Sequence, residues 1–333
     1  MKRRSLFALA GSSAAALALA ACGGSDDTAT GSGSATSKKS TAGGLITIIV
    51  NDPSNAYWTT EGDAAKAAAE ALGYKATVAA HRGDTNTESQ LVDTAISNGS
   101  VALLLDPANA DGSLGAVKKA DAAGIPVFLV NAEINQTGIA KAQLVSNNAQ
   151  GAALGAQQWA QLVGQDCQYA ELLGAPSDNN AATRSNGYKT VLSQYPGLHK
   201  AAEQVANWDR TEGHDKMQAM LQANPGLNAL ISGNDEMVLG AIAALQESGQ
   251  IGQMKAIGGF DGSPDAVDAI KAGTLSYTVL QPVVTFSQAA VKQADSFLKT
   301  GKTGVAEEKQ AFDCILITKD NVDKYTAPFT LSQ

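Results

Sequence analysis

The chain has 333 residues, of which 44% are hydrophobic, so it is long enough for two lobes that each bury a core of their own. Its formal net charge is −8. Binding to nucleic acid or to anionic lipid by charge requires a basic surface, so the composition argues against both partners.

The N-terminus is typical of an export signal. A basic start, "MKRR", precedes an apolar stretch from Leu6 to Ala20, which is too short for a membrane-spanning helix. The stretch ends in "LAAC", which resembles the bacterial lipobox and implies cleavage after residues 1–21 and attachment of lipid to Cys22. The alternative is that Cys22 is an incidental residue of an ordinary signal peptide. "RRSLF" resembles a twin-arginine signal only weakly.

Residues 22–44 consist mainly of Gly, Ser and Thr. Such a segment cannot bury enough apolar surface to fold, so it is expected to be a flexible tether. Together with the lipid, this predicts an exported protein that is anchored to the outer face of the cytoplasmic membrane.

The first half of the chain alternates between apolar strands and Ala-rich helices. Continuous apolar strands separated by helices indicate a parallel sheet that is covered on both faces, here a doubly wound sheet of four strands. The predicted strands are 45–50, 74–80, 101–106 and 126–131, and the predicted helices are 54–72, 85–98 and 112–123.

The second half repeats this scheme, so the predicted fold class is α/β, with two similar doubly wound lobes. Asp235 and Ser263 are expected to begin helices, and Gly249 and Gly273 to end them. The chain is expected to cross between lobes near 147, 281 and 312, which gives a hinge of several crossings and lobes of 45–147 with 282–312 and of 148–281 with 313–333. The predicted strands are 168–174, 200–206, 228–235, 255–262, 276–282 and one near 314–318; the helices are 180–195, 212–224, 235–250, 263–272 and 284–299.

Two cysteines remain after Cys22. Because the protein is predicted to be exported, Cys167 and Cys314 suggest a disulfide that ties the middle of the chain to its end. The alternative is two buried free thiols. The only histidines are at positions 81, 199 and 214, none in ligand spacing, so we expect no metal and no cofactor.

Polar and aromatic side chains collect just past the predicted strands. The carboxyl ends of strands line the ligand crevice of doubly wound sheets. Indole rings, a phenol, amides, carboxylates and one guanidinium suit a small neutral polyhydroxylated ligand, because hydroxyls donate and accept while C–H faces pack on rings. The candidates are Asn55, Tyr57, Trp58, Asp106, Asn131, Arg184, Trp208, Asn234, Asp261 and Gln281, with Asn51 and Glu133 as weaker members.

Six of the candidates also have a purely structural interpretation. The set is more informative than its members, because each follows a separate strand at the same edge. The structural interpretations are helix capping for Asn234 and Asp261, a surface position for Arg184, lobe packing for Tyr57 and Trp58, and turn formation for Asp106.

Three stretches resemble the periplasmic ribose-binding protein group, the type I sugar receptors of ABC importers: "SGNDEMVLGAIAALQESG", "IGGFDGSPDAVDAIKAG" and "NWDRTEGHDKMQAMLQANP". The resemblance implies a monomer that closes its lobes on a sugar and delivers it to permease subunits in the membrane. It implies that residues 57, 58 and 208 are aromatic walls. The residues implied to hydrogen-bond the sugar are Asn55, Arg184, Asn234, Asp261 and Gln281.

The stretch "LVNAE" departs from that group. Ribose receptors carry an Asp followed by an Arg here, whereas this chain has Asn131 and Ala132. The aromatic positions Tyr57, Trp58 and Trp208 are bulkier or more polar than the usual Phe residues. We therefore expect a ligand other than ribose, with an acyclic polyol of four or five carbons favoured and a small pentose as the alternative.

Other functions on this fold leave different signatures. The chain has no G-x-S-x-G, H-E-x-x-H or phosphate-binding glycine loop, so no catalytic residue is predicted and we expect no enzyme. A sugar-responsive transcriptional regulator needs an N-terminal DNA-binding headpiece, where this chain has a signal and a tether. A sensory receptor for a sugar-like signal, in chemotaxis or autoinducer detection, stays open.

Overall fold

The computed structural model describes residues 43–332. The predicted signal peptide, Cys22 and nearly all of the predicted tether lie outside the described residues. None of the helices within residues 43–332 is both long and apolar enough to cross a membrane.

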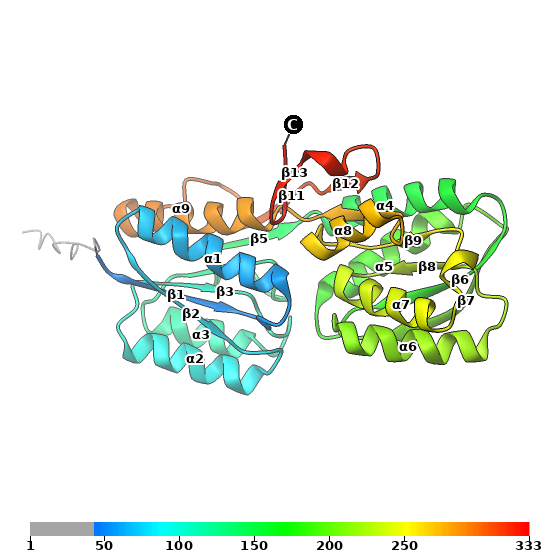
Figure 1. Cartoon of the computed structure of the whole chain (residues 1–333). Coiled ribbons are helices and arrows are strands. Elements are labelled where there is room, and N and C mark those ends of the chain that lie inside the picture. The colour runs from blue at the N-terminus through cyan, green and yellow to red at the C-terminus, as the bar shows by residue number, and fades with distance from the viewer. Residues whose placement is uncertain (1–42, 333) are drawn as a thin grey trace, which may run out of the picture. The chain divides into compact units, whose positions relative to one another are not determined.

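One six-stranded sheet contains the strands of the first half of the chain (Figure 1). Its order is β11-β5-β4-β3-β1-β2, and all neighbours are parallel. β3 and β4 are fully buried, as expected for central strands covered on both faces. The strands are β1 Leu45–Val50, β2 Lys75–Ala80, β3 Ala102–Leu105, β4 Val127–Val130, β5 Ala142–Ser146 and β11 Lys309–Phe312. The predicted sheet of four strands lacked β5 and β11.

A second six-stranded sheet has the order β12-β10-β9-β8-β6-β7. Its strands are parallel except β12, which pairs antiparallel with β10. The strands are β6 Cys167–Leu173, β7 Leu198–Val205, β8 Ala229–Ser232, β9 Ile257–Gly258, β10 Tyr277–Leu280 and β12 Ile315–Thr318. We refer to the two sheets and their helices as the first and the second lobe.

Helices cover both faces of each sheet (Figure 1). In the first lobe α1 packs beside α9 and α2 beside α3; in the second, α4 packs beside α5 and α6 beside α7. The helices are α1 Ala56–Ala71, α2 Thr85–Ser97, α3 Leu114–Ala122, α4 Asn148–Val163, α5 Asn179–Leu192, α6 Arg210–Ala223, α7 Asp235–Glu247, α8 Pro264–Ala272 and α9 Val283–Thr300, with short 3-10 turns at Ile251–Gln253 and Val322–Lys324. The sequence prediction had no helix at α4.

Short polar side chains begin most helices directly after a strand. Ser263 caps α8 as predicted, by accepting from the amide of Ala266. α7 begins at Asp235 as predicted, and the capping oxygen comes from the preceding residue, Asn234. This arrangement brings helix N-termini to the carboxyl ends of the strands, where the site is found.

Within residues 43–332, three segments connect the lobes: β5 to α4, β10 to α9 and β11 to β12. Hydrogen bonds join the first segment to the third. Asn147 donates its amide to Phe312 O at 2.7 Å, and Gln150 and Cys314 exchange two bonds of 2.9 and 3.2 Å. Because these hydrogen bonds hold two of the connecting segments side by side, we expect the lobes to bend relative to each other and not to rotate freely.

The predicted disulfide is wrong, because Cys167 and Cys314 are free, buried thiols. Cys167 begins β6, and Cys314 precedes β12, which lies four strand positions away in the sheet order. Four steps of about 4.8 Å separate them by about 19 Å, whereas a disulfide requires Cα atoms within about 7 Å. Burial raises the pKa of Cys167 to about 11 and that of Cys314 to about 12, so both stay protonated.

The chain ends in a small antiparallel hairpin of β13, Tyr325–Ala327, and β14, Thr330–Leu331, joined by Pro328 and Phe329. We call residues 325–331 the C-terminal hairpin. Phe329 is buried although it lies in the turn.

Candidate ligand-binding site

A small cavity lies where the carboxyl ends of strands from both lobes meet. The structure brings together nine of the twelve candidates there and adds Asp178 and Asn180. The lining residues are Asn55, Tyr57, Trp58, Asn131, Asp178, Asn180, Arg184, Trp208, Asn234, Asp261 and Gln281.

The three other candidates lie outside this cavity. Asn51 and Asp106 line an adjoining groove of about 740 Å³. Glu133 points elsewhere and forms an ion pair with Lys309 at 3.3 Å. The adjoining groove shares Asn55, Trp58, Asp178 and Trp208 with the cavity.

The walls of the cavity are close together. Only about 20 Å³ is open to the centre of a water molecule, which is room for about one water. A sugar-sized ligand therefore does not fit while the walls hold this position, so its binding requires the walls to lie further apart.

A chain of hydrogen bonds fixes the first-lobe wall. The Tyr57 hydroxyl donates to Asn131 Oδ1 at 3.0 Å, and Asn131 Nδ2 donates to Asp106 Oδ2 at 3.0 Å. Asn131 has a φ of 63°, a left-handed conformation that Asn tolerates better than most residues. Asp106 thus supports Asn131 from behind and does not line the cavity.

Burial raises the pKa of Asp106 well above its usual value, and the hydrogen bond from Asn131 is the largest opposing effect. The indole N–H of Trp58 lies close enough to Asp106 to lower the pKa of that acid as well. It nevertheless makes no hydrogen bond of normal geometry with any described residue. The Trp58 N–H therefore lies against Asp106, behind Asn131, without a hydrogen bond of normal geometry.

The start of α1 positions the two neighbouring aromatics. Asn55 caps the helix, since its Oδ1 accepts from the amide of Tyr57 at 2.8 Å. This fixes Tyr57 and Trp58 in the first turn, with their rings edge to face at 6.5 Å. The Nδ2 group of Asn55 is left for a ligand.

Arg184 is the central cation of the second-lobe wall and is 3% exposed. Its Nε donates to Asn148 Oδ1 at 2.7 Å, and one terminal nitrogen donates to Gly233 O at 2.8 Å. The same nitrogen lies 3.5 Å from Asp261 Oδ1. Because a guanidinium has five N–H groups in a fixed plane, it can hold these partners and still donate to a ligand.

Aromatic rings enclose the guanidinium of Arg184, which lies 4.0 Å from the ring centre of Phe260 and 5.2 Å from that of Trp208. Trp208 has a φ of 66°, unusual for a bulky residue. Its ring lies on Gly174, where an added Cβ would be 2.0 Å from the indole. Gly174 is therefore required for this position of the wall.

Asp261 is the buried acid of the second-lobe wall. Gln281 donates to its Oδ1 at 2.7 Å. Burial raises the pKa of Asp261 to about 7, although Arg184 and Gln281 both lower it. The side-chain oxygen of Gln281 is buried and has no hydrogen-bond partner among the described residues.

Asn234 holds the neighbouring loop, because its Oδ1 caps α7 and its Nδ2 donates to Trp208 O at 3.3 Å. The structural interpretation of Asn234 as a cap is thus correct, and the residue also lines the cavity.

Asn180 joins the two walls and was not among the predicted residues. Its Nδ2 donates to Asn131 O at 3.1 Å, and its Oδ1 accepts from Asn148 at 2.8 Å. Asn180 and Asp178 directly follow β6, so the rule used for the other strands could have found them. Asn148 follows β5, which was not predicted.

Glu61 is completely buried one turn after Tyr57. Neither of its oxygens has a hydrogen-bond partner among the described residues. Burial, and secondarily the charge of Asp106, raise the pKa of Glu61 well above its usual value. No cluster of metal-ligating residues is found in the described part of the chain.

Comparisons with known proteins identify the family of this chain. Residues 46–303 match the periplasmic binding protein domain. A D-apiose import binding protein of Actinobacillus succinogenes is 47% identical, with 87% of this chain and 93% of the relative covered. The ribose import binding protein of Escherichia coli is 30% identical over 82% of this chain and 90% of its own length.

Solved structures agree with this assignment. A solute-binding protein of Bacillus halodurans with bound myo-inositol has a TM-score of 0.79 at 25% identity, covering 86% of this chain and 98% of that one. One from Mycobacterium smegmatis with bound glycerol has a TM-score of 0.80 at 24% identity, covering 87% and 99%. The chain therefore belongs to the periplasmic binding protein family, and its two doubly wound lobes are the type I form of that fold.

Proposed function

We propose that this chain is the extracytoplasmic solute-binding protein of an ABC importer and that its ligand is a compact five-carbon sugar of the D-apiose type. Two relatives named as D-apiose import binding proteins, from Actinobacillus succinogenes and Paraburkholderia graminis, are 47% and 46% identical. A ribose import binding protein and a xylitol-binding protein are each 30% identical. D-apiose is a branched pentose, so it corresponds to the alternative expected from the sequence, a small pentose, and not to the acyclic polyol that was favoured.

The observation that carries the proposal is the pair of unpaired buried atoms in the cavity wall. Trp58 Nε1 is a donor from the first lobe, and Gln281 Oε1 is an acceptor at the lobe crossing. A buried polar atom without a partner is costly, at about 1–3 kcal/mol. Sugar hydroxyls both donate and accept, so a ligand in this cavity can pair with the donors and the acceptors of its lining.

The charges around the cavity support a neutral ligand. The Asp and Arg pair expected of ribose receptors is absent from this chain. Ala132 is buried beside Asn131 and supplies no charged donor. Charged recognition comes from Arg184 and Asp261, which largely compensate each other. The rings of Trp58 and Trp208 can pack on the C–H faces of the sugar.

Lobe closure provides the mechanism. Asn180 and Asn131 already bond across the lobes, and a ligand that contacts both walls adds to these bonds. Such a ligand binds the closed form better and shifts the population toward it. The permease would then recognise the closed form, and lipid on Cys22 would keep the monomeric receptor near it.

The proposal is tested by thermal unfolding with D-apiose, D-ribose, xylitol, erythritol and myo-inositol at equal concentrations. A ligand at 100 times its dissociation constant adds about 2.7 kcal/mol to the stability. We expect D-apiose to raise the Tm most. Greater stabilisation by ribose, or none by any sugar, would refute the ligand assignment. Uptake of labelled D-apiose by cells with and without the protein separates import from sensing.

A further inference from the structure

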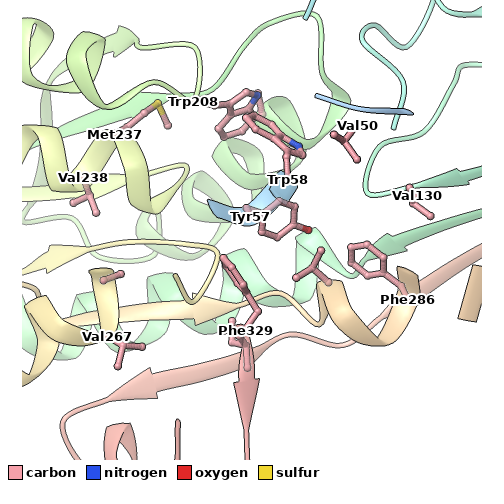
Figure 2. Close-up of a cluster of buried hydrophobic side chains, with 14 of the residues drawn as sticks. Val50, Tyr57, Trp58, Val130, Trp208, Met237, Val238, Val267, Phe286 and Phe329 are labelled. Atoms are coloured by element: carbon pink, nitrogen blue, oxygen red, sulfur yellow. The ribbon is translucent and has the colours of Figure 1, made fainter. Parts of the chain in front are cut away.

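The C-terminal hairpin contributes an aromatic ring beside the cavity. Phe329 is 2% exposed, and its ring lies edge to face on the ring of Tyr57, with centres 5.4 Å apart and an interplanar angle of 87°. Figure 2 shows Phe329 reaching Tyr57 from the end of the chain, with Trp58 and Trp208 on the far side of Tyr57. Tyr57 belongs to the first lobe, so the hairpin touches that lobe at a residue of the cavity wall.

The hairpin is held by the loop that carries Asp261. The Tyr325 hydroxyl donates to Gly262 O at 2.9 Å. The same hydroxyl accepts from the amide of Phe329 at 2.7 Å. Tyr325 thus fixes the turn of the hairpin to the residue that follows Asp261 in the second lobe.

Phe329 has a backbone conformation that is unfavourable for its own side chain. Its φ is 51°, in the left-handed region, where a bulky side chain is uncommon. Asn and Gly are favoured at such turn positions because they adopt positive φ at low cost. A Phe at this position indicates that its ring has a use, since local strain persists where the surrounding structure requires it.

Tyr57 is 3% exposed, and two aromatic rings pack against it. Its hydroxyl is fixed by Asn131, and its ring touches Trp58 and Phe329. Phe329 is the nearer of its two aromatic neighbours, at 5.4 Å against 6.5 Å for Trp58, so without Phe329 this side of the Tyr57 ring has no ring packed against it.

We propose that Phe329 is a positioning residue for ligand binding, which holds the Tyr57 ring in the cavity wall and links it, through the C-terminal hairpin, to the loop of Asp261. The inference rests on the proposed function in that the cavity is taken as the ligand site. Docking of the hairpin and binding of the ligand then favour each other, because both fix Tyr57 against the second lobe.

The decisive variant is Phe329→Asn, which removes the ring but suits the backbone of the turn. The matched control is Thr326→Ala, an exposed position in the same hairpin. We expect Phe329→Asn to bind D-apiose about three- to tenfold more weakly in calorimetry, the range of one aromatic pair, and Thr326→Ala to bind within twofold of wild type. Equal affinities of Phe329→Asn and wild type would overturn the proposal.

Double-mutant cycles separate positioning from general destabilisation. The losses of affinity from Phe329→Asn and Tyr57→Ala should be non-additive, whereas those from Phe329→Asn and Asn234→Ala should add. Additive losses in the Tyr57 cycle would overturn the proposal.

The contact is also tested without any sugar, by measuring the free energy of unfolding of ligand-free Phe329→Asn, Tyr57→Ala and the double variant. If wild type binds none of the sugars, the proposed function fails, while additivity of Tyr57→Ala and Phe329→Asn in unfolding would separately overturn the role of Phe329.

Discussion

Asp261 is expected to make ligand affinity depend on pH. Burial raises the pKa of this acid to about 7, and the acid lines the cavity. A sugar hydroxyl that donates to the carboxylate favours its ionised form. Affinity should therefore rise with pH and level off above about 7.

The size of the effect follows from the pKa. At pH 5, two units below it, about 1% of Asp261 is ionised, so affinity falls by up to about 100-fold, or about 2.7 kcal/mol. The stability of the ligand-free protein should change in the opposite direction. Because the pKa of Asp261 is raised by folding, its contribution to stability is complete below about pH 4 and is lost as the pH rises through about 7.

The assay is calorimetric titration with D-apiose at pH 5, 6, 7 and 8, in buffers that differ in ionisation enthalpy, so that proton release is counted directly. Asp261→Asn should bind more weakly at pH 8 and show little pH dependence. Asp178→Asn is the matched control, because burial also raises the pKa of Asp178 in the same cavity. A wild-type affinity that changes less than threefold over this range, or an Asp261→Asn variant with the wild-type pH profile, would refute the reasoning.

Three further substitutions test the site and its surroundings. Glu61→Gln removes an acid whose pKa is raised well above its usual value in the folded protein. In urea unfolding, the stability of the variant relative to wild type should therefore increase with pH by up to about 1.4 kcal/mol per pH unit above about pH 4.5, with no gain at pH 4. A stability difference that does not change with pH would contradict the raised pKa of Glu61. Gly174→Ala places a Cβ 2.0 Å from the Trp208 ring, so it should cost about 1–3 kcal/mol of stability and weaken D-apiose binding. Gly226→Ala is the control and should do neither, because no atom lies within 4 Å of the added Cβ. Equal effects of the two substitutions would show that the position of the Trp208 ring does not matter. In Arg184→Lys, the lysine cannot replace the planar set of guanidinium donors, so affinity for D-apiose should fall at least about tenfold and stability by about 1–3 kcal/mol. A variant that matches wild type in calorimetric affinity and in its unfolding curve would contradict the central role of the guanidinium.

The alternation of buried strands and helices was sufficient to predict most elements and nine of the eleven residues that line the cavity. The strand β5 was missed because its buried Gln143 breaks the apolar pattern. That side chain is satisfied by Gln136 O and by Glu308, far away in the chain. β11 was missed because it is a half-exposed edge strand with a polar sequence.

Other errors concern distances that no local pattern encodes. The pairing of Cys167 with Cys314 followed from their number, while their separation depends on the order of strands in the sheet. Asp106 follows its strand as expected, but Asn131 lies between it and the cavity. Phe329 gave no signal, because its role depends on a contact with Tyr57 at the other end of the chain.

The two walls of the cavity differ in kind. The carboxyl and guanidinium groups of its lining, those of Asp178, Arg184 and Asp261, belong to the second lobe, whereas the first lobe offers neutral amides and rings. In the open protein, a captured molecule should therefore reside on the second lobe alone, as a loosely held encounter complex. The arrival of the first lobe then sets the residence time, so substitutions in the first lobe should alter the dissociation rate more than the association rate.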